Sequence, residues 1–166
     1  MIKKILTCLT VLSLIVITGC GNSAKKEVPA ETVMAIEQDA TQEDIQEQLG
    51  DSLVSTESNG ESGITANNYE NSTFAGYDGK LSFYYNEDGS VLYYKWFINE
   101  NDKDKAKEIY SDVCQALAGS YGDGEESNSE TSGLYTTSFT NDKQQITAQL
   151  QKANDGGYEI SYMVVG

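Results

Sequence analysis

The sequence predicts an α+β domain: an antiparallel sheet with two helices on one face, and elements in the order α-βββ-α-βββ. Three observations favour this class. Residues 80–98 are crowded with aromatic and β-branched side chains, residues 103–121 repeat apolar positions every three or four residues, and residues 145–151 and 158–165 alternate apolar with polar positions. Strands that follow one another in this way expose one apolar face, and helices cover it.

The first predicted helix begins at Thr41-Gln42-Glu43-Asp44, which has the hydroxyl-x-x-acid form of a capping box. Ile45 and Leu49 share one face of this helix, and Gly50 is a natural stop. Residues 51–71 are rich in Ser, Asn, Gly and Glu and are interpreted as a long loop.

A meander of three strands is expected next. A short strand at 73–76 turns at 77–79 into a strand at 80–85, and a turn at 86–89 leads into a strand at 90–98. Alternation assigns one face of the last two strands to the core. The side chains expected there are Leu81, Phe83, Tyr85, Leu92, Tyr94, Trp96 and Ile98, while Lys95 marks the wetter face.

The second predicted helix is capped by Asn101-Asp102 and ends at Gly122. The following segment, 123–132, carries four acidic residues among Gly, Ser, Asn and Thr, and is interpreted as a solvated loop. Calcium binding is the alternative for this segment, but Asp123, Glu125 and Glu126 lack the ligand spacing of the helix-loop-helix calcium motif.

The chain ends in three more predicted strands, at 134–140, 145–151 and 158–165, with a turn at 141–143 between the first two. Each of the last two offers one apolar face to the core and one polar face to water. The two halves of the predicted domain are alike in their elements, but no residue-level repeat is obvious.

Composition excludes several classes of function. The chain has 26 acidic and 11 basic residues and a formal net charge of −15, so nucleic acid is a poor partner. It contains no histidine and no arginine, which removes the commonest general base, the commonest metal ligand and the bidentate phosphate clamp. We therefore expect a protein that is not an enzyme, with no catalytic residues, no metal site and no cofactor.

The three cysteines have three different expected fates. Cys8 lies in an N-terminal export segment, Cys20 ends that segment, and Cys114 is the only thiol left in the body of the chain. No intrachain disulfide is then expected. Cys114 has no histidine to activate it, so a small residue packed at the edge of a helix face is favoured over a nucleophilic or redox thiol.

The N-terminus has the form of a secretion signal. Met1-Ile2-Lys3-Lys4 is the positive region, and the apolar run from Ile5 to Ile17 is 13 residues long. That is too short for a membrane span, which needs about 20 residues. Ile17-Thr18-Gly19-Cys20 resembles the lipobox of bacterial lipoproteins at all four positions. The resemblance implies cleavage between Gly19 and Cys20 and acylation of the Cys20 thiol; an ordinary cleaved signal is the alternative.

Three parts of the chain are therefore expected: residues 1–19 as signal peptide, 20–40 as the lipidated N-terminus and flexible tether, and 41–166 as one domain. Removal of the signal, which carries Lys3 and Lys4, changes the formal charge from −15 to −17. Lys25 and Lys26 in the tether are attracted to anionic lipid headgroups. The protein is expected on the extracytoplasmic side of the bacterial cell membrane, bound to it through acylated Cys20.

Gly76-Tyr77-Asp78-Gly79 before a hairpin and Tyr121-Gly122 after a long helix give the body a topology similar to small helix-plus-meander envelope lipoproteins, among them outer-membrane assembly lipoproteins and secreted β-lactamase-inhibitor-like modules. A protein-binding or scaffolding role, with an envelope protein as partner, is the expectation. The alternative is a small-ligand or glycan binder, which requires Trp96 and several tyrosines exposed on one patch.

Overall fold

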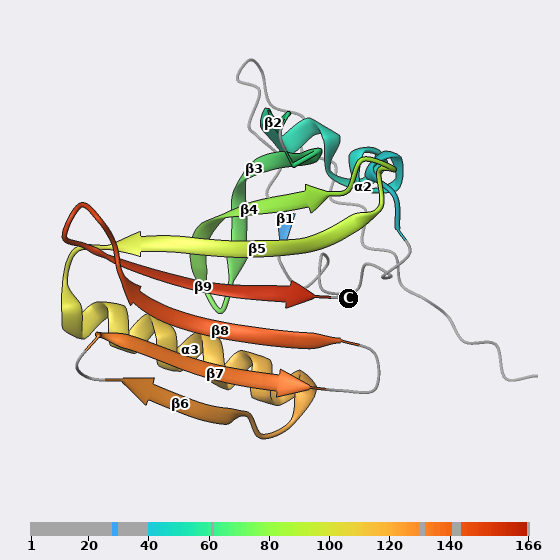
Figure 1. The fold of residues 1–166 in the computed structure, drawn as a ribbon. Helices are drawn as coiled ribbons and strands as arrows, with labels where there is room; N and C mark the ends of the chain where they lie inside the picture. The colour runs from blue at the N-terminus through green and yellow to red at the C-terminus, as the bar shows by residue number, and fades with distance from the viewer. Residues whose placement is uncertain (1–27, 30–39, 61, 130–131, 141–143, 166) are drawn as a thin grey trace, which may run out of the picture.

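The computed structural model describes residues 28–29, 40–60, 62–129, 132–140 and 144–165. In these parts of the chain, nine strands form one sheet and two α-helices accompany it (Figure 1), which confirms the α+β class. The elements in chain order are β1 (Val28–Pro29), α2 (Gln42–Leu49), the 3-10 turn η1 (Gly50–Ser52), β2 (Leu53–Asn59), β3 (Ile64–Phe74), β4 (Tyr77–Tyr85), β5 (Val91–Glu100), α3 (Lys103–Tyr121), β6 (Glu125–Ser129), β7 (Leu134–Thr140), β8 (Gln145–Lys152) and β9 (Tyr158–Val165).

The predicted order α-βββ-α-βββ is wrong, because each helix is followed by four strands. The segment 51–71, interpreted as a loop, contains β2 and much of β3, and the segment 123–132 contains β6. The strands that were missed are polar, and every β6 residue is exposed. They therefore lack the apolar alternation that identifies a strand with one buried face.

The two four-stranded meanders join at their last strands. The strand order is β2-β3-β4-β5-β9-β8-β7-β6, with antiparallel pairing throughout. Trp96 of β5 lies opposite Tyr162 of β9 at this junction. The short β1 adds a parallel pair to the end of β3, where Val28 lies opposite Ser72. One continuous sheet thus holds the whole described domain together.

The turns reveal a structural repeat. In both meanders the turn between the third and fourth strands carries Asp-Gly, with a positive φ at Gly89 (81°) and at Gly156 (95°). The same pair of backbone hydrogen bonds closes each turn. In the first turn, Gly89 N donates to Asn86 O and Asn86 N donates to Ser90 O. In the second, Gly156 N donates to Ala153 O and Ala153 N donates to Gly157 O. The hairpins before them also match, since Ser-Gly ends both turns, with φ of 68° at Gly63 and 65° at Gly133. The two meanders therefore share their turn geometry although their sequences differ.

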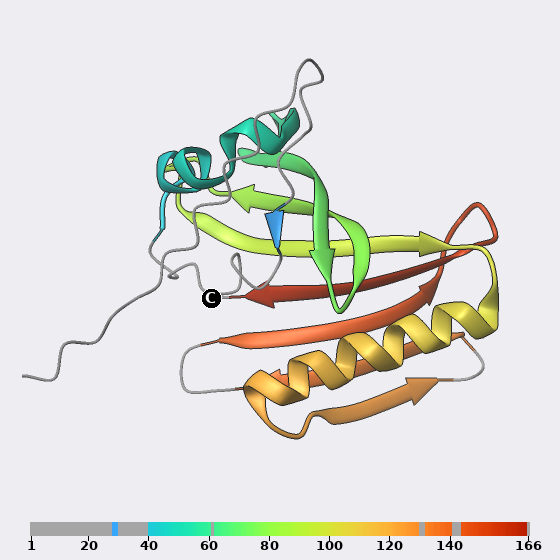
Figure 2. The same cartoon turned by 180° about the vertical axis from the view of Figure 1, so that it is seen from behind.

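The core lies between α3 and one face of the sheet (Figure 2). Buried side chains recur along α3 at the helical spacing, and alternate residues of β8 and β9 face them. This burial explains why the apolar alternation of the C-terminal strands was visible in the sequence. The residues concerned are Ala106, Ile109, Val113 and Leu117 of α3, Ile146, Ala148 and Leu150 of β8, and Ile160, Tyr162 and Val164 of β9.

The hairpin of β3 and β4 bends over the same side of the sheet as α3 (Figure 2). A register shift between Tyr69 and Ser72 allows the bend, and Asn71 there has φ of 59°. The predicted turn at 77–79 is displaced: the connection is Ala75-Gly76, both with positive φ, as a two-residue hairpin turn of type I′ requires. At the tip, the Tyr77 hydroxyl donates to Asp112 Oδ2 of α3 at 2.7 Å.

Leu92 was expected in the core with Tyr94 and Trp96, but it is not part of the core cluster. Tyr84 pairs with Tyr93 and Tyr85 pairs with Val91, so Leu92 is the extra residue of a β-bulge. None of the described helices is long and apolar enough to cross a membrane.

Candidate functional site

One face of the sheet, opposite α3, is covered by neither described helix (Figure 1). The strand register arranges its side chains in rows across β4, β5, β9 and β8. We call this surface the open face. Its members are Lys80, Ser82 and Tyr84 of β4, Tyr93, Lys95 and Phe97 of β5, Glu159, Ser161, Met163 and Val165 of β9, and Thr147, Gln149 and Gln151 of β8.

A charged cluster fixes the centre of the open face. Lys95 Nζ lies 2.7 Å from Glu159 Oε1, and Gln151 Nε2 donates to the same oxygen at 2.9 Å. The Lys95 ammonium also lies 5.2 Å from the centroid of the Phe97 ring. Each side chain limits the rotamers of its neighbour, so this surface loses little conformational entropy when a partner binds.

Aromatic side chains extend from this centre toward the β4–β5 turn. The rings of Tyr84 and Tyr93 stack with centroids 4.3 Å apart. Partial burial, together with the neighbouring Tyr84 hydroxyl, raises the pKa of Tyr93 above the ordinary tyrosine value. Val165 lies opposite Tyr93 and has 38% of its surface exposed. Rigid amphipathic rings next to aliphatic side chains are typical of protein interfaces.

Two hollows on the open face meet at Lys80 and Phe97, which line both. One measures about 300 Å³ and lies toward Asn71, and the other measures about 270 Å³ and lies toward Val54 of β2. Val54 is 48% exposed, the highest fraction among the large hydrophobic residues that the structure describes. The surface around Phe97 can therefore accept side chains from a partner on both sides of the ring.

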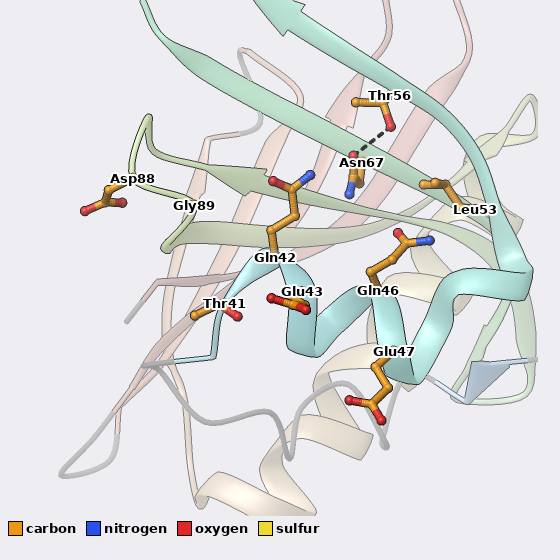
Figure 3. A pocket seen from close by; sticks show the side chains of 10 residues that line it. All are labelled: Thr41, Gln42, Glu43, Gln46, Glu47, Leu53, Thr56, Asn67, Asp88 and Gly89. Carbon is orange, nitrogen blue, oxygen red and sulfur yellow. Dashed lines mark hydrogen bonds between the residues drawn. The ribbon is translucent and has the colours of Figure 1, made fainter.

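A polar cleft of about 850 Å³ lies between α2, the β2–β3 ladder and the β4–β5 turn. Figure 3 shows the amides of Gln42 and Gln46, one helical turn apart on α2, extending toward Thr56 and Asn67 of the strands. Thr56 Oγ1 donates to Asn67 Oδ1 at 2.9 Å, and Asn67 is almost fully buried. Amide and hydroxyl groups dominate this wall of the cleft, and Glu43, Glu47 and Asp88 also line it.

Two buried tyrosine hydroxyls accompany Asn67. They belong to Tyr69 and Tyr85, and burial is the main cause that raises the pKa of both hydroxyls. Neither hydroxyl has a hydrogen-bond partner among the described residues, so each loses its contact with water without a replacement bond.

The residues predicted for lipidation and cleavage, Gly19 and Cys20, lie outside the described residues, as do the predicted signal 1–19, the turn 141–143, and Lys25 and Lys26. From the predicted tether, Val28 and Pro29 are described, paired with β3. Acylation of Cys20 and attachment of the protein to the membrane remain predictions from the sequence.

Cys114 and Trp96 are placed by the fold. Burial raises the pKa of the Cys114 thiol, which disfavours its reactive thiolate. Trp96 is fully buried, and its Nε1 donates to the Ser72 carbonyl oxygen at 2.9 Å. Trp96 therefore supplies no exposed ring for a sugar to stack on, which the glycan alternative required.

The acidic segment 123–132 does not close around an ion in the described residues. Residues 125–129 form an edge strand with exposed side chains, and no group of three His, Cys, Asp or Glu residues suited to a metal ion occurs in the part of the chain that the structure describes.

Comparison with known protein families, curated proteins and solved structures finds no match.

Sequence reasoning found only part of the open face. Lys95 marked the wetter side of its strand, and that side is the open face. Glu159 and Gln151 were not linked to Lys95, since they reach it only through the pairing of β5, β9 and β8. The polar cleft was missed because β2, which forms one wall of it, was interpreted as a loop.

Proposed function

We propose that this chain is a lipid-anchored, non-enzymatic lipoprotein of the bacterial envelope that binds another protein through the open face. The observation that supports it is the rigid cluster of Tyr93, Lys95, Phe97 and Glu159 on a sheet surface that neither described helix covers. The lipobox at Cys20 supports attachment to the membrane. The absence of histidine and arginine from the sequence supports a binding role rather than catalysis.

The chemistry of the surface restricts the partner. Phe97 and Tyr93 are large anchors that fit pockets of a partner, whereas the formal net charge, −17 once the signal is removed, favours a partner with basic residues around those pockets. Long-range attraction between such surfaces raises the association rate and weakens as salt is added.

Site-specific photo-crosslinking in intact cells tests the binding surface. A photoreactive residue at Tyr93 is expected to give one dominant adduct with an envelope protein, and Phe97→Ala in the same chain is expected to remove it. The matched position is Gln115, which is exposed on α3 away from the open face. Equal adducts at both positions, or none at Tyr93, would falsify the proposed surface.

Membrane attachment is tested separately. Cys20→Ala is expected to abolish lipidation. Once the signal has been cleaved from this variant, the chain is not retained in the membrane fraction, because no acyl chain remains. A processed Cys20→Ala chain that still sediments with membranes in detergent-free buffer contradicts anchoring through this residue. Failure here leaves the crosslinking result at Tyr93 intact, so the two parts of the proposal are independent.

The polar cleft supports a second candidate, the binding of a small neutral ligand such as a glycan. Its observation is the convergence of Gln42, Gln46, Thr56 and Asn67 in Figure 3. Such a site binds through amides and hydroxyls without stacking on Trp96. A thermal shift with N-acetylglucosamine oligosaccharides that disappears in Gln42→Ala/Gln46→Ala, but not in the Gln115→Ala control, supports this candidate; no shift with the wild-type chain contradicts it.

A further inference from the structure

A small pocket at the start of α3 differs in charge from the rest of this acidic protein. It measures about 240 Å³ and lies between the first turns of α3, the β6–β7 turn, and strands β7, β8 and β9. Its lining contains three lysines, Lys103, Lys107 and Lys152, and no described carboxylate residue. Six lysines fall within the described residues, so half of them line this one pocket.

These three lysines have no ion-pair partner among the described residues. The ion pairs found there join Lys95 to Glu159 and Lys105 to Glu100. Acids close to the pocket are engaged elsewhere: Asp102 Oδ1 accepts the first backbone N–H groups of α3, and Glu100 accepts N–H groups of residues 101 and 102 besides Lys105. No carboxylate of the described residues therefore forms an ion pair with a lysine of the pocket.

Aromatic rings and one aliphatic side chain complete the pocket. Lys107 Nζ lies 5.4 Å from the centroid of the Tyr135 ring, and Tyr158 and Leu150 form further walls. Ammonium groups attract an anion, and the rings provide apolar contact for whatever carries that anion. The small volume admits a compact head of a few atoms, less than a drug-sized ligand requires.

We infer that this pocket binds a phosphate group carried on a small organic body. Three ammonium groups match a multiply charged anion better than a single carboxylate, and a phosphate monoester carries about 1.5 to 2 negative charges at pH 7. A soluble phosphate monoester and phosphatidic acid, the lipid whose headgroup is itself a phosphate monoester, both present this chemistry. The inference does not depend on the open face, which is formed by the opposite side of the sheet.

Lysine footprinting on the full-length chain in nanodiscs tests the site residue by residue. In phosphatidylcholine nanodiscs, glycerol 3-phosphate at constant ionic strength is expected to slow acetylation of Lys103, Lys107 and Lys152 at least about threefold. Lys80 and Lys105, which lie outside the pocket, are the internal controls and are expected to react unchanged. Protection in nanodiscs that contain phosphatidic acid, without added glycerol 3-phosphate, identifies the lipid headgroup as the source of the phosphate.

Calorimetry with charge-matched variants separates a site from general attraction. Lys103→Gln/Lys107→Gln/Lys152→Gln is expected to weaken binding of the phosphate source identified by footprinting at least about tenfold, whereas Lys80→Gln/Lys95→Gln/Lys105→Gln, with the same loss of charge, changes it less than about twofold. Thermal melts of both variants establish that they are folded. Equal losses in the two triple variants, equal protection of all lysines, or no protection in either nanodisc overturns the inference.

Discussion

The indole nitrogen of Trp96 donates a hydrogen bond to the carbonyl oxygen of Ser72, 2.9 Å away, and both residues are completely buried. Ser72 follows the register shift that bends β3, and Trp96 lies opposite Tyr162 where the two meanders join. The Trp96 ring also stacks with the Tyr162 ring, and the two ring centroids are 5.8 Å apart. One side chain thus connects the bent hairpin to the centre of the sheet.

Replacement of Trp96 by Phe should be strongly destabilising. The variant leaves the Ser72 carbonyl without its indole donor in a dry environment and opens space in the core, so we expect the free energy of unfolding to fall by about 2 to 4 kcal/mol. Urea denaturation followed by circular dichroism measures this. Phe97→Leu on the open face of the same strand is the control and should cost less than about 1.5 kcal/mol. Equal costs would mean that the buried contact contributes nothing beyond strand propensity.

Two glycine substitutions should change the free energy of unfolding in opposite directions. A Cβ at Gly79 would lie 2.5 Å from the Trp96 ring, whereas a Cβ at Gly119, inside α3, meets nothing within 4 Å. Gly79→Ala is therefore expected to destabilise by about 1 to 3 kcal/mol, because the packed ring must move. Gly119→Ala is expected to stabilise by about 0.5 to 1 kcal/mol, because alanine loses less backbone entropy in a helix. Thermal unfolding of the two variants decides; stabilisation by Gly79→Ala contradicts the close packing.

Stability should fall at alkaline pH through the tyrosines. The hydrogen bond from Tyr77 to Asp112, followed by desolvation and the charges of Asp112 and Glu108, raises the pKa of Tyr77 to about 12. Between pH 10 and 12 the unfolded chain loses this proton while the folded chain retains it. The contribution of the Tyr77–Asp112 contact to stability is therefore complete below pH 10 and is lost as the pH rises through 12. Chemical denaturation at several pH values measures the slope, and Tyr77→Phe should make it shallower.

Asp112→Asn tests whether the carboxylate or burial raises the pKa of Tyr77. The amide cannot provide the negative charge that holds the phenolic proton, so the pKa of Tyr77 should fall toward 10. Titration of the Tyr77 ring carbon by NMR reports this value directly. An unchanged pKa in Asp112→Asn would assign the shift to desolvation.

Cys114 should alkylate slowly in the folded protein. Burial raises the pKa of its thiol, although hydrogen bonds with Thr137 and Tyr110 act in the other direction. We expect iodoacetamide to modify Cys114 several-fold more slowly at pH 7.5 in buffer than in urea, since the thiolate is the reacting form. Mass spectrometry of the peptide containing Cys114 gives the rate. Faster reaction in the folded state would indicate an activated thiol and revive the redox interpretation.

The elements that the sequence predicted well are those with one buried face or a clear cap. Thr41 and Asp44 form the expected capping box, and Asp102 caps α3 as expected. Strands β4, β5, β8 and β9 face the core, so their alternation is strong. Strands β2 and β6 lie at the sheet edges, where every β6 side chain and most of the described β2 side chains are exposed, so only the turn glycines indicate them.

The candidate site was less predictable than the fold. A single strand shows that Lys95 faces away from the core, but its contact with Glu159 depends on pairing between segments 64 residues apart in sequence. The lysine pocket depends in the same way on α3, β7, β8 and β9 meeting at one end of the sheet. Such contacts follow from register, which local periodicity does not determine.

The place of β9 in the sheet has a consequence for how the protein folds. β9 follows the other described strands in sequence, yet it lies in the middle of the sheet, between β5 and β8. Before β9 is in place, β5 and β8 each have an unpaired edge that can pair with other chains. The two halves of the sheet therefore become one only when β9 enters between them.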